Sequence, residues 1–103
     1  MENLHNDMEV KEQYLFLLRK FVAEHGAEYG ITRIGIFGSV ARGEQQNESD
    51  VDILVEFEKP IGVEFIDLSN ILEKEFNRKV DVVSLKGIKY KYLKEIEKDI
   101  VYA

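Results

Sequence analysis

Two aspartates in this sequence have the spacing of a paired carboxylate site. Asp50 and Asp52 are separated by one residue and lead into the apolar run Ile53-Leu54-Val55. Alternate residues of a β-strand share a face, so both carboxylates would point the same way, with Cα atoms roughly 6.5–7 Å apart. They would repel each other unless a cation lay between them, and two metal ions about 3.5–4 Å apart would suit them. The alternative is a solvated turn before an edge strand, although the continuous apolar run favours a central strand.

Asp81 is a third candidate, because it interrupts a valine-rich segment at residues 79–83. A lone buried carboxylate is costly unless it is paired or coordinates a metal. Asp81 would therefore either join the first two aspartates at a metal site or face solvent from an edge strand, with Val80 and Val82 turned inward. The residues alone leave both alternatives open.

Gly38 and Ser39 follow an apolar stretch and precede Arg42, in an arrangement that could bind phosphate. Glycine lets the backbone approach a ligand closely, and the start of a helix offers free N–H groups and the positive end of the helix dipole. The serine hydroxyl and the arginine charge would add to this binding. Gly-Ser is also a common turn dipeptide, and Arg42 could instead form a surface ion pair with Glu44 or Glu48.

The expected secondary structure places these residues near strand ends. Hydrophobic periodicity and turn residues predict helices over about residues 7–24, 40–42, 63–76 and 88–99, and strands over 31–37, 51–57, 79–85 and 100–102. Asn6 or Asp7 would cap the first helix, and Gly26 and Gly30 would mark its end. This order indicates an α+β or mixed α/β domain, with a small mixed sheet flanked by helices.

Length and composition narrow the possible functions. The 103 residues fit one domain, and 14 basic against 20 acidic residues give a formal net charge of −6. This balance argues against stable nucleic-acid binding through phosphate neutralisation. The absence of cysteine and the presence of only two histidines leave carboxylates as metal ligands, which favours magnesium, calcium or manganese. No signal-peptide or membrane-span pattern is visible, so we expect a cytoplasmic protein.

Several residues outside these motifs have a structural interpretation. His5 and His25 are expected to act at helix ends. Three tyrosines are interpreted as parts of buried or half-buried stripes, namely Tyr14, Tyr90 and Tyr92. The local concentration of basic residues consists of Lys86, Lys89, Lys91 and Lys94. A solvated helix face is the default interpretation of these lysines, and a docking surface for an acidic partner is the alternative.

Taken together, the motifs resemble the signature of the DNA polymerase β-type nucleotidyltransferase superfamily: Gly38-Ser39-x-Ala41-Arg42-Gly43, Ser49-Asp50-x-Asp52-x-x-Val55 and the valine-flanked Asp81. Within that superfamily the chain is most similar to the minimal nucleotidyltransferases, which are commonly encoded beside a HEPN-domain protein as a toxin–antitoxin pair. The resemblance extends from residue 31 to the end of the chain. It implies a polymerase β-like fold and a single nucleotidyltransferase domain at residues 1–103, with an N-terminal helix at 1–30 and a catalytic core at 31–103.

The resemblance also implies a role for each site residue. The triphosphate of ATP would be held by Gly38 and Ser39, with Arg42 adding charge beside it. Asp50 and Asp52 would bind two magnesium ions that bridge the phosphates. Asp81 would bind the metal near the acceptor hydroxyl and help to deprotonate that hydroxyl. The reaction would be an in-line attack on the α-phosphorus, with pyrophosphate leaving.

The leading hypothesis is a magnesium-dependent enzyme that transfers AMP from ATP to a hydroxyl. A chain of 103 residues has no obvious place for a separate acceptor-binding domain, so the acceptor would be either small and weakly held or supplied by a docking partner, and the resemblance favours the partner. The resemblance implies that this acceptor is a tyrosine of a cognate HEPN ribonuclease toxin, which the chain would silence as an antitoxin. The alternatives are a non-catalytic antitoxin that neutralises its partner by binding, and a nucleotidyltransferase acting on a small molecule such as an antibiotic.

Overall fold

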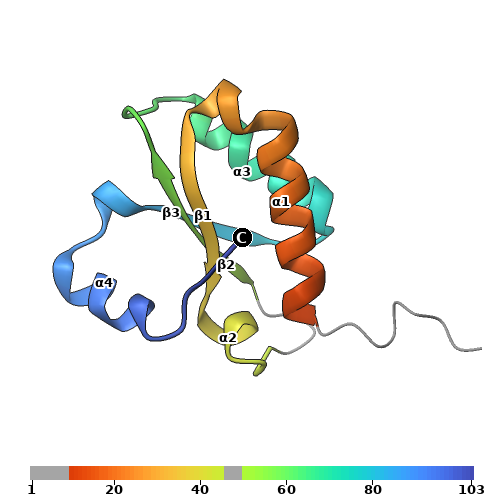
Figure 1. Ribbon diagram of the computed structural model, residues 1–103, viewed down its shortest axis with the longest axis vertical. Helices are drawn as coiled ribbons and strands as arrows, with labels where there is room; N and C mark the ends of the chain where they lie inside the picture. The colour runs from red at the N-terminus through yellow and green to blue at the C-terminus, as the bar shows by residue number, and fades with distance from the viewer. Residues whose placement is uncertain (1–9, 46–49) are drawn as a thin grey trace, which may run out of the picture.

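The computed structural model describes residues 10–45 and 50–103, which form a four-stranded sheet with helices beside it (Figure 1). The elements follow in the order α1 (Val10–Tyr29), β1 (Ile31–Phe37), α2 (Gly38–Ala41), β2 (Val51–Phe57), α3 (Glu64–Phe76), β3 (Val80–Ser84), a 3₁₀ turn (Leu85–Gly87), α4 (Tyr90–Glu97) and β4 (Val101–Tyr102). No helix in this part of the chain is long and apolar enough to span a bilayer. The predicted helix caps, His5, Glu48 and Ser49 lie outside the described residues.

The sheet is mixed, with its strands in the order β3-β2-β1-β4. Strand β1 is antiparallel to both β2 and β4, whereas β2 and β3 are parallel. The prediction that the strand after Asp52 is central is confirmed, because β2 lies between β1 and β3. Its two neighbours determine which residues meet at its start: Asp52 is in register with Phe37 of β1 and with Asp81 of β3.

One face of the sheet forms the hydrophobic core against α1 and α3, which lie together beside the strands (Figure 1). The two central strands contribute alternate apolar side chains, and the helices contribute leucines and a phenylalanine: Ile34, Ile36, Val51, Ile53, Val55, Leu18, Phe21, Leu68 and Leu72. Each fully buried aliphatic side chain contributes about 1.5–3 kcal/mol to stability. The strands that carry the candidate site are therefore firmly held from one side.

The end of α1 differs from its prediction. The helix continues past residue 24 to Tyr29, and Gly26 is buried within it. A β-carbon at Gly26 would lie 3.0 Å from Cγ1 of Val22, so this glycine relieves crowding inside the helix. The prediction that Gly26 marks the helix end is wrong, whereas Gly30 ends the helix with φ of +68°.

Helix α4 is shorter than predicted, and none of its residues is buried. The interpretation of Tyr90 and Tyr92 as half-buried is wrong, because their side chains are 71% and 64% exposed. The physical reason is that α4 packs only loosely on the described part of the chain. Tyr14 of α1 is buried and stacks on Phe76 of α3 as expected, with ring centroids 4.9 Å apart.

Candidate active site

Two of the predicted aspartates, Asp52 and Asp81, lie side by side near the starts of β2 and β3, and Asp50 directly precedes β2. Because Asp52 alternates with the core residues Val51 and Ile53, its side chain lies on the sheet face turned away from α1 and α3. Asp81 shares that face through its register with Asp52, and the exposed Asp50 precedes β2 directly. The two alternatives for Asp81 therefore combine: it is exposed on an edge strand, and it also stands beside Asp52.

Gly38 brings the turn after β1 directly against Asp52. Its φ of +75° lies in the left-handed region that favours glycine, and a β-carbon at this position would overlap Oδ2 of Asp52. The register pairing of Phe37 with Asp52 sets this approach. The backbone at Gly38 therefore approaches the carboxylate of Asp52 closely, and the predicted approach of phosphate to this backbone stays a prediction.

Helix α2 starts at this turn and presents Ser39 in its first turn. Val40 is almost fully buried and fixes the short helix to the core. The residue before the helix, Phe37, has an extended backbone, and no described side chain caps the helix start. The N–H groups of a first helical turn have no intrahelical acceptor, so they can donate to an anion together with the half-buried serine hydroxyl.

Arg42 makes two short ionic hydrogen bonds. Its Nε donates to Glu44 Oε2 at 2.9 Å, and its Nη1 donates to Asp99 Oδ2 at 2.7 Å. These bonds raise the pKa of Arg42 above its ordinary value, with the bond to Glu44 contributing most. The predicted alternative of an ion pair with Glu44 is therefore observed. Asp99 was missed because it lies 57 residues further along the chain.

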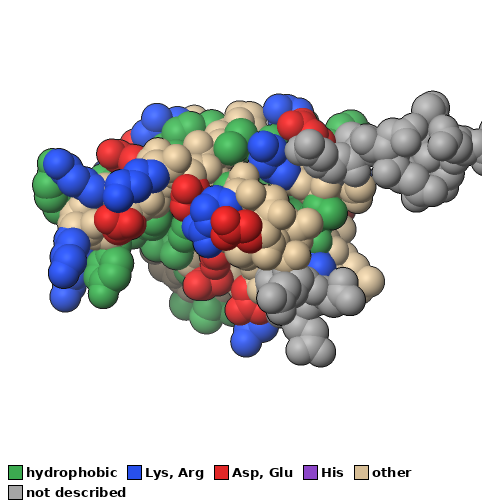
Figure 2. All heavy atoms as spheres, turned by 90° about the horizontal axis from the view of Figure 1, so that it is seen from below, with side chains coloured by type: hydrophobic (Ala, Val, Ile, Leu, Met, Phe, Trp, Pro, Cys, Tyr) green, Lys and Arg blue, Asp and Glu red, His purple; other side chains and the backbone are tan. Residues whose placement is uncertain are grey.

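The site carries uncompensated negative charge. The pKa of Asp52 is raised above its ordinary value by burial, and the charges of Asp81 and Asp50 raise it further, while Arg42 partly offsets them. Figure 2 shows acidic side chains gathered in the middle of this side of the molecule, with basic side chains towards the end formed by α4. This electrostatic environment favours binding of a cation.

The aspartates fit a magnesium site that the substrate completes. Within residues 10–45 and 50–103, no three acidic or histidine side chains form a preformed metal cage. Magnesium is usually held by one or two carboxylates together with waters and substrate phosphates. A half-buried carboxylate flanked by two exposed ones beside an uncapped helix start suits that arrangement.

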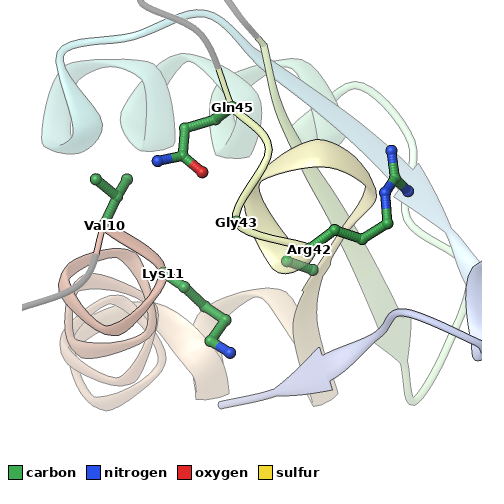
Figure 3. Close-up of a pocket in the computed structure, with 6 residues that line it drawn as sticks. Val10, Lys11, Arg42, Gly43 and Gln45 are labelled. Carbon is green, nitrogen blue, oxygen red and sulfur yellow. The ribbon is translucent and has the colours of Figure 1, made fainter.

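A separate cavity of about 400 Å³ lies between the start of α1 and the end of α2 (Figure 3). Lys11 and Gln45 line it, and the buried Gln45 Oε1 has no hydrogen-bond partner in the described part of the chain. The guanidinium of Arg42 points away from it (Figure 3). Among the described residues no aspartate lines this cavity, so we place the candidate active site where β2 and β3 begin and not in this cavity.

Comparison with known proteins gives a consistent result. Residues 17–102 match the family model described as the nucleotidyltransferase domain, and this range contains every predicted site residue. The chain is 42% identical over 98 residues to the Methanocaldococcus jannaschii protein MJ1379, which is provisionally named a protein adenylyltransferase. That similarity covers 91% of this chain and 94% of the relative.

Two solved structures agree with the fold. One, provisionally described as a minimal nucleotidyltransferase, superposes with a TM-score of 0.71 and 33% identity, covering 84% of this chain and 93% of the other. The second is a complex of tri-AMPylated Shewanella oneidensis HEPN toxin with MNT antitoxin, with a TM-score of 0.69. Its 16% identity, over 90% of this chain and 71% of the other, shows the fold alone. The predicted polymerase β-like fold is confirmed.

Proposed function

Since this chain belongs to the nucleotidyltransferase domain family and is a nucleotidyltransferase, we propose that it moves AMP from ATP to a tyrosine hydroxyl of a HEPN ribonuclease toxin. The transfer would require Mg²⁺ and would silence the toxin, which makes the chain an antitoxin. The observation that carries the proposal is the group of Asp50, Asp52 and Asp81 at the sheet edge, with Gly38 against the central carboxylate.

The aspartates would hold the metal, and their different positions suggest different roles in the reaction. Bound Mg²⁺ would supply Lewis-acid stabilisation of the charge that develops on the phosphate oxygens. Asp52 is half-buried, and the charges of the other two act on it, so it would be the main carboxylate ligand of the metal. Asp81 is exposed on the edge strand, where its carboxylate would orient an incoming hydroxyl and accept its proton.

The turn at Gly38 and Ser39 would position the triphosphate. Uncapped N–H groups and the serine hydroxyl would donate to phosphate oxygens and hold the α-phosphorus in line with the hydroxyl. The acceptor oxygen then forms a bond to the α-phosphorus as the bond to the β-phosphate oxygen breaks. The bonding electrons leave with pyrophosphate, so the transfer balances without any further reactant.

The exposed position of the site supports a protein acceptor. Asp50 and Asp81 are exposed in the described part of the chain, near the starts of β2 and β3, and neither lines the cavity beside α2. An enzyme for a small molecule usually surrounds most of its substrate, whereas an open edge admits a tyrosine presented by a folded partner. The solved complex of an AMPylated HEPN toxin with an antitoxin of the same fold supports this choice.

The test incubates the chain with purified HEPN partner, ATP and Mg²⁺, and then measures the intact mass of the partner. Wild type should add adenylyl groups, and chelation of the metal should prevent the addition. Asp52→Asn should add none while it still co-purifies with the partner. If a folded, transfer-dead Asp52→Asn variant protects cells from the toxin fully, the chain neutralises by binding and the proposed transfer is wrong.

A further inference from the structure

Helix α4 and the turn before it form a basic and aromatic surface on an acidic protein. We call this the α4 surface and define it by Lys86, Lys89, Tyr90, Lys91, Tyr92 and Lys94. Residues 82–94 contain four lysines and no acidic residue, whereas Glu95 and Glu97 follow in the last turn of α4, and the whole chain has a formal charge of −6. The rest of the chain is therefore more acidic than the total indicates, and Figure 2 shows several basic side chains, with acidic ones among them, at the end of the molecule formed by α4.

The side chains of this surface are not used by the fold. Tyr90 and Tyr92 are mostly exposed, and α4 has no buried residue. Lys94 lies 5.2 Å from the ring centre of Tyr90, and no ion pair to Lys89 or Lys91 is formed among the described residues. In contrast, Lys20 and Lys98 pair with glutamates of the chain itself.

Exposed tyrosines beside unpaired positive charge are suited to protein recognition. Tyrosine is enriched at the energetically dominant positions of interfaces, because it buries a large area and loses little conformational entropy. Complementary charges around such positions steer the encounter and fix orientation. The partner that fits the α4 surface is therefore a folded protein with an acidic patch.

The α4 surface is also joined to the candidate active site. Asp99, two residues after α4, accepts the 2.7 Å hydrogen bond from Arg42, and Arg42 directly follows α2, the helix that begins at Gly38 against Asp52. At the other end of the surface, Lys86 follows the end of β3, whereas Asp81 lies near the start of that strand. The connection to the aspartates therefore runs through the Asp99 end of α4, and a protein bound along α4 would approach them from that end.

We propose that the α4 surface docks the acceptor protein through an acidic patch on that protein, so that docking presents the acceptor hydroxyl to the aspartates. This inference rests on the proposed function for the identity of the acceptor. The docking surface lies on α4, and the face of the partner that binds it carries negative charge. The acidic remainder of the chain would repel the same patch, which restricts productive orientations.

The test compares two variants of the α4 surface with matched exposed residues elsewhere. Tyr92→Ala is paired with Phe16→Ala of α1, which removes an aromatic side chain of similar exposure. Lys91→Glu of α4 is paired with Lys74→Glu in the exposed last turn of α3, so that both variants change the net charge equally. Affinity for the purified HEPN partner should fall about tenfold or more for each α4 variant. Both controls should bind like wild type, and all variants should keep the circular dichroism spectrum of wild type.

Transfer kinetics and salt provide second readouts. The α4 variants should raise KM for the partner and leave both ATP binding and kcat at saturating partner unchanged. Wild-type affinity should fall as salt increases, and the lysine variant should show a weaker salt dependence. If wild type docks through α4 but transfers no AMP, the proposed function fails and the docking surface stands. If the α4 variants bind the partner like wild type, the proposed docking surface is wrong. It is also wrong if the variants keep their affinity for the partner and lose affinity only for RNA.

Discussion

The two faces of β2 illustrate two opposite uses of one strand. Val51, Ile53 and Val55 are fully buried against α1 and α3. Asp52, which lies between the first two of them, faces the other way and meets the charges of Asp50 and Asp81. The first face supplies stability through apolar burial, and the second gathers like charges that oppose folding in the absence of metal. Burial of the apolar face therefore holds the carboxylates close together, although their like charges repel each other.

Adjacent substitutions on the two faces should separate activity from stability. Asp52→Asn removes a metal-binding charge at nearly constant volume, so transfer should fall by about a thousandfold or more. Ile53→Ala leaves the carboxylates in place but opens a cavity in the core, which should cost about 2–5 kcal/mol. Denaturant unfolding and initial transfer rates would measure both effects. A large stability loss in Asp52→Asn would mean that the two faces are not separate in function.

Two glycines with similar backbone angles test the contact at Gly38. Gly43 has φ of +72° and open space around it, so Gly43→Ala should cost only the backbone strain, about 1–2 kcal/mol. Gly38→Ala adds an overlap with Asp52 to the same kind of strain. It should therefore lose more stability than Gly43→Ala and also weaken ATP binding, as measured by unfolding and titration calorimetry. Equal effects of the two substitutions would show that the approach to Asp52 is unimportant.

Sequence reasoning succeeded where the determining pattern is local. The bounds of β1 and β2 follow from short apolar runs, and the face of Asp52 follows from strand alternation. Asp50 directly precedes β2, so its predicted shared face with Asp52 stays a prediction. The orientation of Asp81 could not be decided from the sequence, because it depends on the register between β2 and β3, whose residues are far apart in the chain. The bond between Arg42 and Asp99 was missed for the same reason.

The exposure of Tyr90 and Tyr92 shows a different limit. Helical periodicity tells which residues share a face, but it does not tell whether another element covers that face. The apolar stripe of α1 is covered by the sheet, whereas α4 is covered by little of the described chain. Stripes of comparable appearance in the sequence therefore have opposite burial in the structure.

The ion pair between Arg42, which follows α2, and Asp99, which follows α4, should contribute less to protein stability than the core or the turn at Gly38. The side chains of Arg42 and Asp99 are 42% and 25% exposed, so Asp99→Asn should lower stability by at most about 1 kcal/mol. Glu44→Gln removes the other, more exposed partner of Arg42 and should have no measurable effect on stability. If Asp99 positions Arg42, then only Asp99→Asn should raise KM for ATP. Equal KM values for both variants would contradict that role.

The smallest expected effect is the pH dependence of the metal-free protein. Because the pKa of Asp52 is raised in the folded state, folding favours the protonated carboxyl. Its stabilising contribution is present below the unfolded-state value, near the ordinary 3.8, and is lost as pH rises through the folded-state pKa. Asp52→Asn has no such titration, so its stability relative to wild type should increase between that acidic range and neutral pH. Urea unfolding of both proteins with a metal chelator would measure the difference, and saturating Mg²⁺ with ATP should reverse it by stabilising only wild type. A difference that stays constant with pH would mean that burial and the neighbouring aspartates do not act on Asp52, and the carboxylate face would then carry no stored repulsion for a metal to relieve.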